Sequence, residues 1–576
     1  MNKLLILIGL LILGFGTVLP LFHPSYFPMH DDTQPARVYE MTTALRSGQF
    51  PVRWVGDLGY GYGYPLFNFY APFPYYVGAL FQLVGFDPVS SAKLMMGIGM
   101  LIATFTMFFL GKRLGGVIIG FVSAILYSYA PYHAVDLFVR GAVGELFAYA
   151  FIPLFLLGIY ELYSRKIKIQ SLKMLIINCR TGIGTTIMGL ALILLSHNIL
   201  GMVALYIVTL LLIIGVLMSL VRRRLDGRLV ALLISTVLTL GLTSFFILPA
   251  YLEKGITKVD TLITGGSIYS DHFVEPFQLW DSPWGFGGSV PGSYDGLSYK
   301  IGKLLVVVAV MGIFALIIRI VKRGSILFWE IPAIVFTLLS LFLTLSYSEY
   351  IWNFIPGFSY IQYPWRLLVL VIAGCTIMTI SWFRLLQKTL LYVASFGIVI
   401  TYLIFNLKYF QPQTEIPYAN LDYTSKQSLE YKISKISDEY MPKNFIPPSS
   451  NDELQTRLSN YGDVLDVQVV KDVPTRKIYQ ITVDNSDVLS DVKIFRPHIA
   501  VFPGWIGMVD NHEVSLKEYQ GEIELPISAG IHHVELVLKN TLIRQVGNAI
   551  SLLTLFLIVY GLFFLSSKAY ETTKLR

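Results

Sequence analysis

Long apolar segments with few charges recur along the chain and restrict its fold more than any other feature. A transmembrane helix needs ~20 mostly apolar residues, and about twelve segments meet or approach that length. Only 14% of the residues are charged, whereas soluble domains carry about 25%. The sequence therefore predicts a polytopic α-helical membrane protein. The predicted spans are Leu4–Leu21, Ser91–Leu110, Val117–Ala130, Leu146–Tyr160, Ile183–Leu195, Leu200–Leu220, Leu229–Leu248, Leu304–Ile320, Trp329–Thr344, Leu367–Trp382, Leu390–Phe405 and Ile550–Leu565.

The charges between these spans predict an orientation, because cytoplasmic loops carry an excess of Lys and Arg. Alternate loops are basic, with Lys112-Arg113, Arg165-Lys166-Lys168, Arg222-Arg223-Arg224 with Arg228, Lys322-Arg323, Arg384 with Lys388, and the tail Lys568, Lys574 and Arg576. The other loops hold Asp31, Asp32, Asp136, Glu145, Asp260, Asp271 and the region 411–544. We therefore expect both termini in the cytoplasm and the acidic loops outside. The net charge of +7 follows from the basic loops, so the expected partner is the lipid bilayer and no nucleic acid.

Two apolar segments do not fit this alternation as spans. Tyr64–Phe86 contains Pro65, Pro72 and Pro74, which break a regular helix. We expect it to lie along the outer membrane interface, where aromatic residues are favoured. Ser171–Arg180 is expected to form a separate helix at the cytoplasmic interface, because an arginine is costly at membrane depth.

The pattern changes after Phe405 and divides the chain into three parts. Residues 1–406 are predicted to form the multi-span membrane domain, with a first external loop at 23–90 and an external, lid-like loop at 253–302. Residues 407–545 are predicted to form an extracytoplasmic β-sandwich, because apolar residues alternate with period two. Residues 546–576 hold the last span and a cytoplasmic tail. The predicted strands are Val464–Val470, Ile478–Val483, Val492–Val501, Glu522–Leu525 and His533–Leu538.

The motif His30-Asp31-Asp32 follows the first span, where that helix should leave the membrane. Adjacent carboxylates at such a place accept a proton from a nucleophile or bind a divalent cation. The alternative is a polar loop that merely ends a helix. The short motif alone does not decide between these readings.

Other polar residues border the external ends of spans. Asp136, Arg140 and Glu145 form either a structural ion pair or part of a polar cavity. His197 is expected to cap a helix end. Tyr64 belongs to an aromatic, glycine-rich stretch that suits sugar rings and a membrane interface equally. Arg366 is either a membrane anchor or a phosphate ligand, since its planar fork suits bidentate phosphate binding.

Several longer motifs resemble a known family. They are His30-Asp31-Asp32, Phe50-Pro51-Val52-Arg53-Trp54, Gly63–Pro72, Arg140-Gly141 with Glu145, Ser196-His197-Asn198, Gln362–Arg366, Glu439-Tyr440-Met441-Pro442 and Phe502-Pro503-Gly504-Trp505. Together they resemble the bacterial membrane proteins catalogued as 6-pyruvoyl-tetrahydropterin-synthase-related, which are similar to YfhO-like proteins and to GT-C fold glycosyltransferases. Pterin synthases themselves are zinc enzymes with a histidine cluster, and the nine histidines here are scattered. We therefore expect no pterin chemistry.

The GT-C resemblance implies a membrane glycosyltransferase acting at the outer face. Its donor would be a polyprenyl-phosphate-linked sugar and its acceptor a cell-envelope glycan or glycolipid. Asp31 or Asp32 would be catalytic. The candidate substrate-binding residues are His30, Tyr64, Arg140, Glu145, His197, Gln362, Trp365 and Arg366. Mg²⁺ or Mn²⁺ is a further candidate cofactor, with Asp31, Asp32 and Asp136 as candidate ligands. The alternatives are a lipid or polysaccharide transporter (a flippase) and a non-catalytic envelope scaffold.

Overall fold

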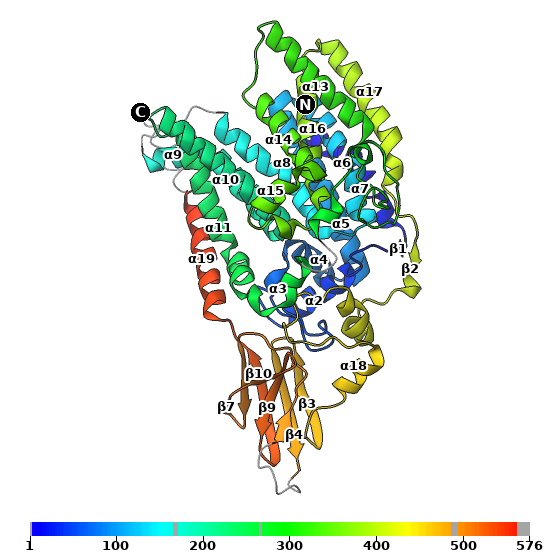
Figure 1. The fold of residues 1–576 in the computed structure, drawn as a ribbon, viewed down its shortest axis with the longest axis vertical. Helices are drawn as coiled ribbons and strands as arrows, with labels where there is room; N and C mark the ends of the chain where they lie inside the picture. Colours follow the sequence, from blue (N-terminus) through cyan, green and yellow to red (C-terminus); the bar gives the residue numbers. More distant parts are fainter. Residues whose placement is uncertain (1–2, 165–170, 264–267, 485–492, 562–576) are drawn as a thin grey trace.

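The computed structural model describes residues 3–164, 171–263, 268–484 and 493–561. It consists of a large helical body with a smaller β domain projecting from one end (Figure 1). The mean hydropathy of the chain is +0.61, and many helices of the body expose apolar side chains on one face. Such a surface suits a lipid environment, in agreement with the predicted membrane class.

Nine helices in the described part of the chain are long and apolar enough to cross a membrane. They are α5 (Pro88–Gly115), α8 (Val143–Tyr163), α9 (Leu172–Ser196), α10 (Asn198–Val221), α11 (Gly227–Glu253), α13 (Lys303–Val321), α16 (Leu368–Phe383), α17 (Lys388–Asn406) and α19 (Leu542–Val559). Two bent pairs raise the number to as many as 11: α6 (Val117–Ser128) with α7 (Pro131–Phe138), and α14 (Glu330–Thr344) with the segment Ser346–Phe354, which includes α15 (Glu349–Phe354). The shorter apolar α1 (Lys3–Phe15) falls in the first predicted span. Each predicted span thus coincides with a helix, although residues 562–565 of the last one lie outside the described residues.

The structure corrects one predicted break and supports the exclusion of one span. Ser171–Arg180 is not a separate helix, because α9 runs without interruption from Leu172 to Ser196. Lys173–Ser196 is about 36 Å long at the usual rise per residue, which exceeds the ~30 Å apolar core and leaves its first turns free to extend beyond it. The segment Tyr64–Phe86 holds only α3 (Leu66–Phe69) and the 11-residue α4 (Phe73–Leu83). Neither is long enough to span a bilayer, while its position along the interface stays a prediction.

The first external loop folds onto the helical body. Its longest helix, α2 (Gln34–Arg46), packs against α4 and α5 and is buried on most of its surface. The two-residue strand β1 (Ser25–Tyr26) pairs with β2 (Ile416–Pro417), which comes almost 400 residues later. This loop therefore contacts the segment that leads into the β domain.

The β domain contains two antiparallel sheets. The larger has the order β3 (Asp466–Val473), β4 (Arg476–Val483), β10 (Gly530–Leu538), β6 (Trp505–Val509) and β7 (His512–Val514), and the smaller has the order β5 (Lys493–Phe495), β9 (Glu522–Ile527) and β8 (Lys517–Tyr519). The prediction missed β6, β7 and β8, of which the last two have three residues each. The predicted strand Val492–Val501 is only β5 in the described residues, because Pro497 cannot continue a ladder of hydrogen bonds.

Short helices make up much of the long connections. They are α12 (Pro276–Trp280), α18 (Asn451–Leu458), η1 (Leu19–Phe22), η2 (Lys254–Ile256), η3 (Lys258–Ile263), η4 (Tyr269–His272), η5 (Ser346–Ser348), η6 (Phe358–Ile361), η7 (Pro364–Leu367), η8 (Leu407–Tyr409), η9 (Tyr418–Asn420), η10 (Ser428–Ile433) and η11 (Ser434–Ile436).

A buried ion pair fixes the β domain to the helical body. Arg544, the third residue of α19, donates from Nε to Glu253 Oε2 at the end of α11 over 3.1 Å, and its side chain is 1% exposed. Glu253 also accepts from Thr541 and from Asn68 of α3. Its carboxylate therefore joins three segments that are far apart in the sequence, beside the point where α11 and α19 lie side by side (Figure 1).

Arg544→Met is expected to lower stability strongly, because it removes the directly paired charge of the buried Glu253 carboxylate and leaves the more distant Arg53 as counter-charge. Breaking such a pair from one side costs ~3–5 kcal/mol. The midpoint of thermal unfolding of the purified protein in detergent measures the effect, with the exposed Lys539→Met as control. The double variant Glu253→Met/Arg544→Met should recover part of the loss. Equal midpoints for Arg544→Met and Lys539→Met would contradict a stabilising role for the pair.

The predicted orientation can be tested by cysteine labelling, because both native cysteines, Cys179 and Cys375, are buried. In intact cells a membrane-impermeant maleimide should label Ser459→Cys in the β domain. It should label Arg224→Cys, in a basic loop, only after the membrane is permeabilised. Both native residues are exposed. The reverse labelling pattern would overturn the orientation.

Candidate functional site

The acidic motif of the first external loop lies directly against the second external loop. The backbone N–H of His30 donates to the carbonyl of Val139 over 3.1 Å, and that of Asp31 donates to the carbonyl of Arg140 over 2.9 Å. These two backbone hydrogen bonds between turns fix the acidic motif beside Arg140. Sequence positions more than 100 residues apart thereby share one site.

Gln34, at the start of α2, reinforces the pairing. Its amide donates to the carbonyl oxygens of Asp31 at 3.1 Å and Gly141 at 2.8 Å, so it connects the two loops directly. Its own carbonyl accepts from the hydroxyl of Tyr75 at 2.8 Å. The Gln34 side chain is fully buried, and all of these bonds replace contacts with water that it has lost.

The two aspartates of the motif have different surroundings. Asp31 is exposed, and its carboxylate forms no hydrogen bond among the described residues. Asp32 is half-buried and accepts from the hydroxyl of Tyr423 over 2.6 Å. Burial raises the pKa of the Asp32 carboxyl above its ordinary value, although the Tyr423 hydrogen bond opposes this shift. Asp31 is therefore the carboxylate that is open to a ligand.

His30 contributes a ring that packs edge-to-face on Phe286, with centroids 4.8 Å apart. Burial lowers the pKa of His30 below its ordinary value, and the positive charge of Arg140 acts in the same direction. Phe286 belongs to the predicted lid-like loop, 253–302. That loop therefore reaches the acidic motif.

A buried ionic cluster lies on the other side of this pairing. Arg140 contacts Asp136 Oδ1 at 2.5 Å and Glu145 Oε2 at 2.8 Å, and the side chains of the three residues are at most 8% exposed. Glu145 Oε1 also accepts from the hydroxyl of Tyr132 at 2.8 Å. The guanidinium carbon of Arg140 lies 4.4 Å from the ring centroid of Trp365. A charge can stay buried only with such partners.

Arg366 joins the same cluster from the motif that precedes α16. Its Nε lies 3.7 Å from Glu145 Oε2 and forms no hydrogen bond among the described residues. Its Nη1 donates to the Ile361 carbonyl at 2.7 Å and to Gln362 Oε1 at 3.1 Å. Gln362 has φ of 63°, a strained conformation for a residue other than glycine, and such strain is often found at functional sites.

The cluster has unused hydrogen-bonding capacity. Among the described residues, Asp136 Oδ2, Trp365 Nε1 and Arg366 Nε are buried without a hydrogen-bond partner. Buried polar atoms of this kind normally have partners, and several in one place suggest room for a ligand or water. The two guanidinium groups are balanced by the carboxylates of Asp136 and Glu145.

His197 lies at the edge of the cluster and also caps α10, as expected. Its Nδ1 accepts from the backbone N–H of Leu200 at 3.2 Å. Burial lowers the pKa of His197 to about 3, and Arg366 contributes to the shift. The ring is therefore neutral at physiological pH.

Tyr64 is not part of this assembly. It is 1% exposed, and its hydroxyl accepts from the backbone N–H of Tyr440 at 3.2 Å, within the contact between the first loop and the segment 437–442. The structure thus brings together His30, Asp31, Asp32, Arg140, Glu145, His197, Gln362, Trp365 and Arg366, with Asp136, and leaves Tyr64 as a packing residue.

The residues present do not assemble a metal site. No group of three or more His, Cys, Asp and Glu side chains in the described part of the chain could hold a metal ion. Asp136 pairs with Arg140, and Asp32 accepts from Tyr423. The candidate ligands Asp31, Asp32 and Asp136 therefore do not converge, and the Mg²⁺ or Mn²⁺ expectation finds no support in their arrangement.

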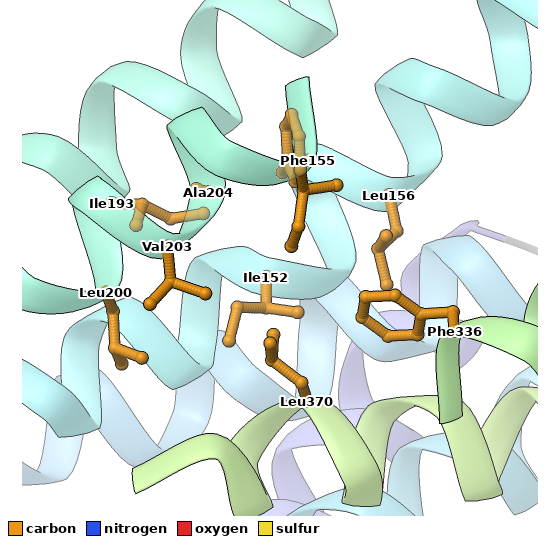
Figure 2. A pocket seen from close by; sticks show the side chains of 10 residues that line it. Ile152, Phe155, Leu156, Ile193, Leu200, Val203, Ala204, Phe336 and Leu370 are labelled. Atoms are coloured by element: carbon orange, nitrogen blue, oxygen red, sulfur yellow. The ribbon is translucent and has the colours of Figure 1, made fainter. Parts of the chain in front are cut away.

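An apolar crevice begins close to the cluster. Figure 2 shows it between α8, α9, α10, α14 and α16, with Ile152, Ile193, Leu200, Val203, Phe336 and Leu370 among its lining residues. Leu200 follows His197 by one helical turn, and Leu370 follows Arg366 by one turn. Ile152 lies two turns after Glu145 on α8, or about 10 Å along the axis.

Two residues of the site escaped the sequence analysis as candidates: Tyr132 and Tyr423. Gln34, the amide that ends the stretch His30–Gln34, starts α2 together with Pro35. Tyr423 belongs to the polar connection after α17, and no local pattern links it to Asp32.

Comparisons with known proteins place the chain in a family. No curated protein matches its sequence. Among solved structures, ArnT from Cupriavidus metallidurans bound to undecaprenyl phosphate is similar with 14% identity and a TM-score of 0.37, over 69% of this chain and 63% of that one. The apo oligosaccharyltransferase of Archaeoglobus fulgidus is similar with 13% identity and a TM-score of 0.40, over 77% of this chain and 57% of that one. Its complex with zinc and sulfate gives 12% identity and a TM-score of 0.40, over 77% and 58% of the two chains.

The matched region therefore spans less than two thirds of each of these larger proteins. The family comparison is more specific. Residues 67–410, more than half of the chain, match the family described as "6-pyruvoyl-tetrahydropterin synthase related domain; membrane protein". The family resemblance of the motifs is thereby confirmed, and the chain belongs to the 6-pyruvoyl-tetrahydropterin synthase related family of membrane proteins.

Proposed function

We propose that the protein is a membrane glycosyltransferase that moves a sugar from a polyprenyl-phosphate donor to a cell-envelope glycan or glycolipid at the outer face. One observation carries the proposal: the open Asp31 carboxylate is held by its own backbone beside a buried cluster with two arginines. A general base next to a phosphate-binding group at the membrane surface is the arrangement that transfer from a lipid-phosphate sugar requires.

Arg366 would bind the donor phosphate, and Arg140 would neutralise the neighbouring carboxylates. The planar guanidinium of Arg366 can form two parallel hydrogen bonds to phosphate oxygens. Its Nε is unsatisfied, and its distance of 3.7 Å from Glu145 is longer than a hydrogen bond. Arg140 is already engaged by Asp136 and Glu145, so its role is to keep these carboxylates away from the phosphate.

The apolar crevice has a volume of only about 10 Å³, too small for an isoprene unit, so the polyprenyl chain would lie against the exposed apolar side chains of the helical body. The crevice is lined almost entirely by aliphatic and aromatic side chains and begins within two helical turns of Glu145, His197 and Arg366 (Figure 2). The phosphate would then lie at the ionic cluster.

Asp31 would act as the general base. Its carboxylate accepts the proton of an acceptor hydroxyl while the hydroxyl oxygen forms a bond to the anomeric carbon. The bond between that carbon and the phosphate oxygen breaks, and the polyprenyl phosphate leaves with the electron pair. Asp32 is less suited to this role, because it is half-buried and Tyr423 donates to one of its two carboxylate oxygens. Neutral His30, beside Asp31, can orient the acceptor hydroxyl.

Asp31→Asn should lose about 10²–10⁴-fold in transfer rate, because general-base assistance is worth that much and an amide cannot accept the proton. Asp32→Asn should lose much less, since its amide oxygen still accepts from Tyr423. Transfer from a polyprenyl-phosphate sugar to envelope acceptors is measured at matched membrane levels. Full activity of both variants would remove the catalytic role of the motif and favour a transporter or a scaffold.

Arg366→Lys should raise the donor concentration needed for half-maximal rate by about tenfold, equivalent to the loss of one charge-assisted hydrogen bond. Lysine keeps the charge and loses the planar fork. Rates are measured at limiting and at saturating donor, and the exposed Arg476→Lys is the control. An unchanged donor dependence would leave Arg366 with only a structural role as a partner of Glu145 and Gln362.

A further inference from the structure

A second recess lies on the β domain, between its sheets and the connection 442–444, with Ile256 as the one described lining residue from the loop after α11. Its volume is about 570 Å³, and its lining includes Lys443, Asn444, Phe502, Trp505, Lys517 and Glu518. We call it the junction groove. Sites for small molecules usually have volumes of about 300–1,000 Å³, so the junction groove has room for a short ligand.

Backbone pairing holds both walls of the junction groove. On one side, the N–H of Lys443 donates to the Ile256 carbonyl at 3.1 Å, and the N–H of Lys258 donates to the Met441 carbonyl at 3.0 Å. On the other side, the N–H of Val501 donates to the Gly521 carbonyl at 2.9 Å. The groove is therefore formed before any ligand binds, which lowers the entropic cost of binding.

The lining combines aromatic surface with polar groups. Phe502 and Trp505 pack on Trp54, with ring centroids 5.5 and 5.6 Å from it. Trp505 is 8% exposed, and its indole N–H has no hydrogen-bond partner among the described residues. At the rim, Asn444 Nδ2 donates to Glu518 Oε1 over 2.9 Å, which leaves the amide oxygen of Asn444 able to accept.

This combination matches a saccharide better than a lipid or a polyanion. A sugar ring presents an apolar C–H face and a surrounding set of hydroxyl donors and acceptors. The two lysines and one glutamate of the lining give a charge of only about +1, too little to attract a densely charged polymer. A neutral or singly acidic sugar is the expected ligand.

Aromatic contacts connect the junction groove to the acidic motif. Phe502 lies edge-on to Phe69 with centroids 6.1 Å apart, and Phe69 stacks on Tyr440 at 5.4 Å. The next residue, Tyr70, packs against Tyr75 at 5.8 Å. Tyr75 binds Gln34, which in turn holds the backbone of Asp31. Ring contacts and hydrogen bonds thus connect the junction groove with the acidic motif.

We propose that the junction groove is a saccharide-binding subsite that holds a distal part of the acceptor glycan. That the saccharide is the acceptor depends on the proposed function, whereas saccharide binding is inferred from the lining of the junction groove alone. The β domain would then present the glycan to the helical body. Its role would not be limited to shielding the site.

The test is direct binding of labelled oligosaccharides to the full-length protein in nanodiscs. The probes are fluorescent glucose, N-acetylglucosamine and glucuronic acid hexamers. Wild type should bind the glucose or the N-acetylglucosamine hexamer. Asn444→Trp, which fills the mouth of the groove from an exposed position, should weaken that binding at least about tenfold, or 1.4 kcal/mol. Gln468→Trp, which adds the same side chain to exposed β3, should bind like wild type, and all proteins should melt at similar temperatures.

Asp31→Asn separates this proposal from the proposed function, because it should retain oligosaccharide binding while it loses transfer. If the wild type binds oligosaccharide but transfers no sugar, the proposed transferase activity is contradicted and the saccharide-binding proposal stands. Absence of binding for all three hexamers, equal binding by Asn444→Trp and wild type, or displacement by an unglycosylated peptide would each overturn the groove as a saccharide site.

Discussion

The buried charge of Arg140 is the interaction on which the site depends. A guanidinium removed from water must be paired, because its desolvation costs several kcal/mol. Asp136 and Glu145 provide that pairing at 2.5 and 2.8 Å. The pairing ties α7 to the start of α8, and the backbone carbonyl of Arg140 accepts from the N–H of Asp31. One electrostatic requirement thus determines where the acidic motif lies.

A second buried ion pair holds the β domain against the helical body. Arg544 and Glu253 connect α19 and α11, while Asn68 brings in the first external loop. Because both ends of the β domain are tied to the helical body, through β1–β2 pairing and through Arg544, the junction groove has defined walls. The proposed donor and acceptor sides therefore belong to one rigid framework.

Much of the site could be predicted because its residues lie at the ends of apolar segments. The charges Arg140, Glu145 and Arg366 are rare in such positions and therefore noticeable. Tyr64 was misplaced because a buried packing tyrosine and a sugar-binding tyrosine have the same local sequence. Tyr423 was missed because only the chain's return after α17 brings it to Asp32. The three short strands β6, β7 and β8 lack enough alternating residues to give a signal.

The sequence by itself determined the membrane class, the positions of the helices and the presence of a β domain. These follow from local rules: about 20 apolar residues can span a bilayer, and alternating apolar residues form a half-buried strand. The tertiary structure decided that Asp31 is open while Asp32 accepts from Tyr423, that Asp136 pairs with Arg140, and that a groove forms between the sheets of the β domain and the connection 442–444. These features depend on contacts between residues that are tens to hundreds of positions apart, and no local pattern encodes such contacts.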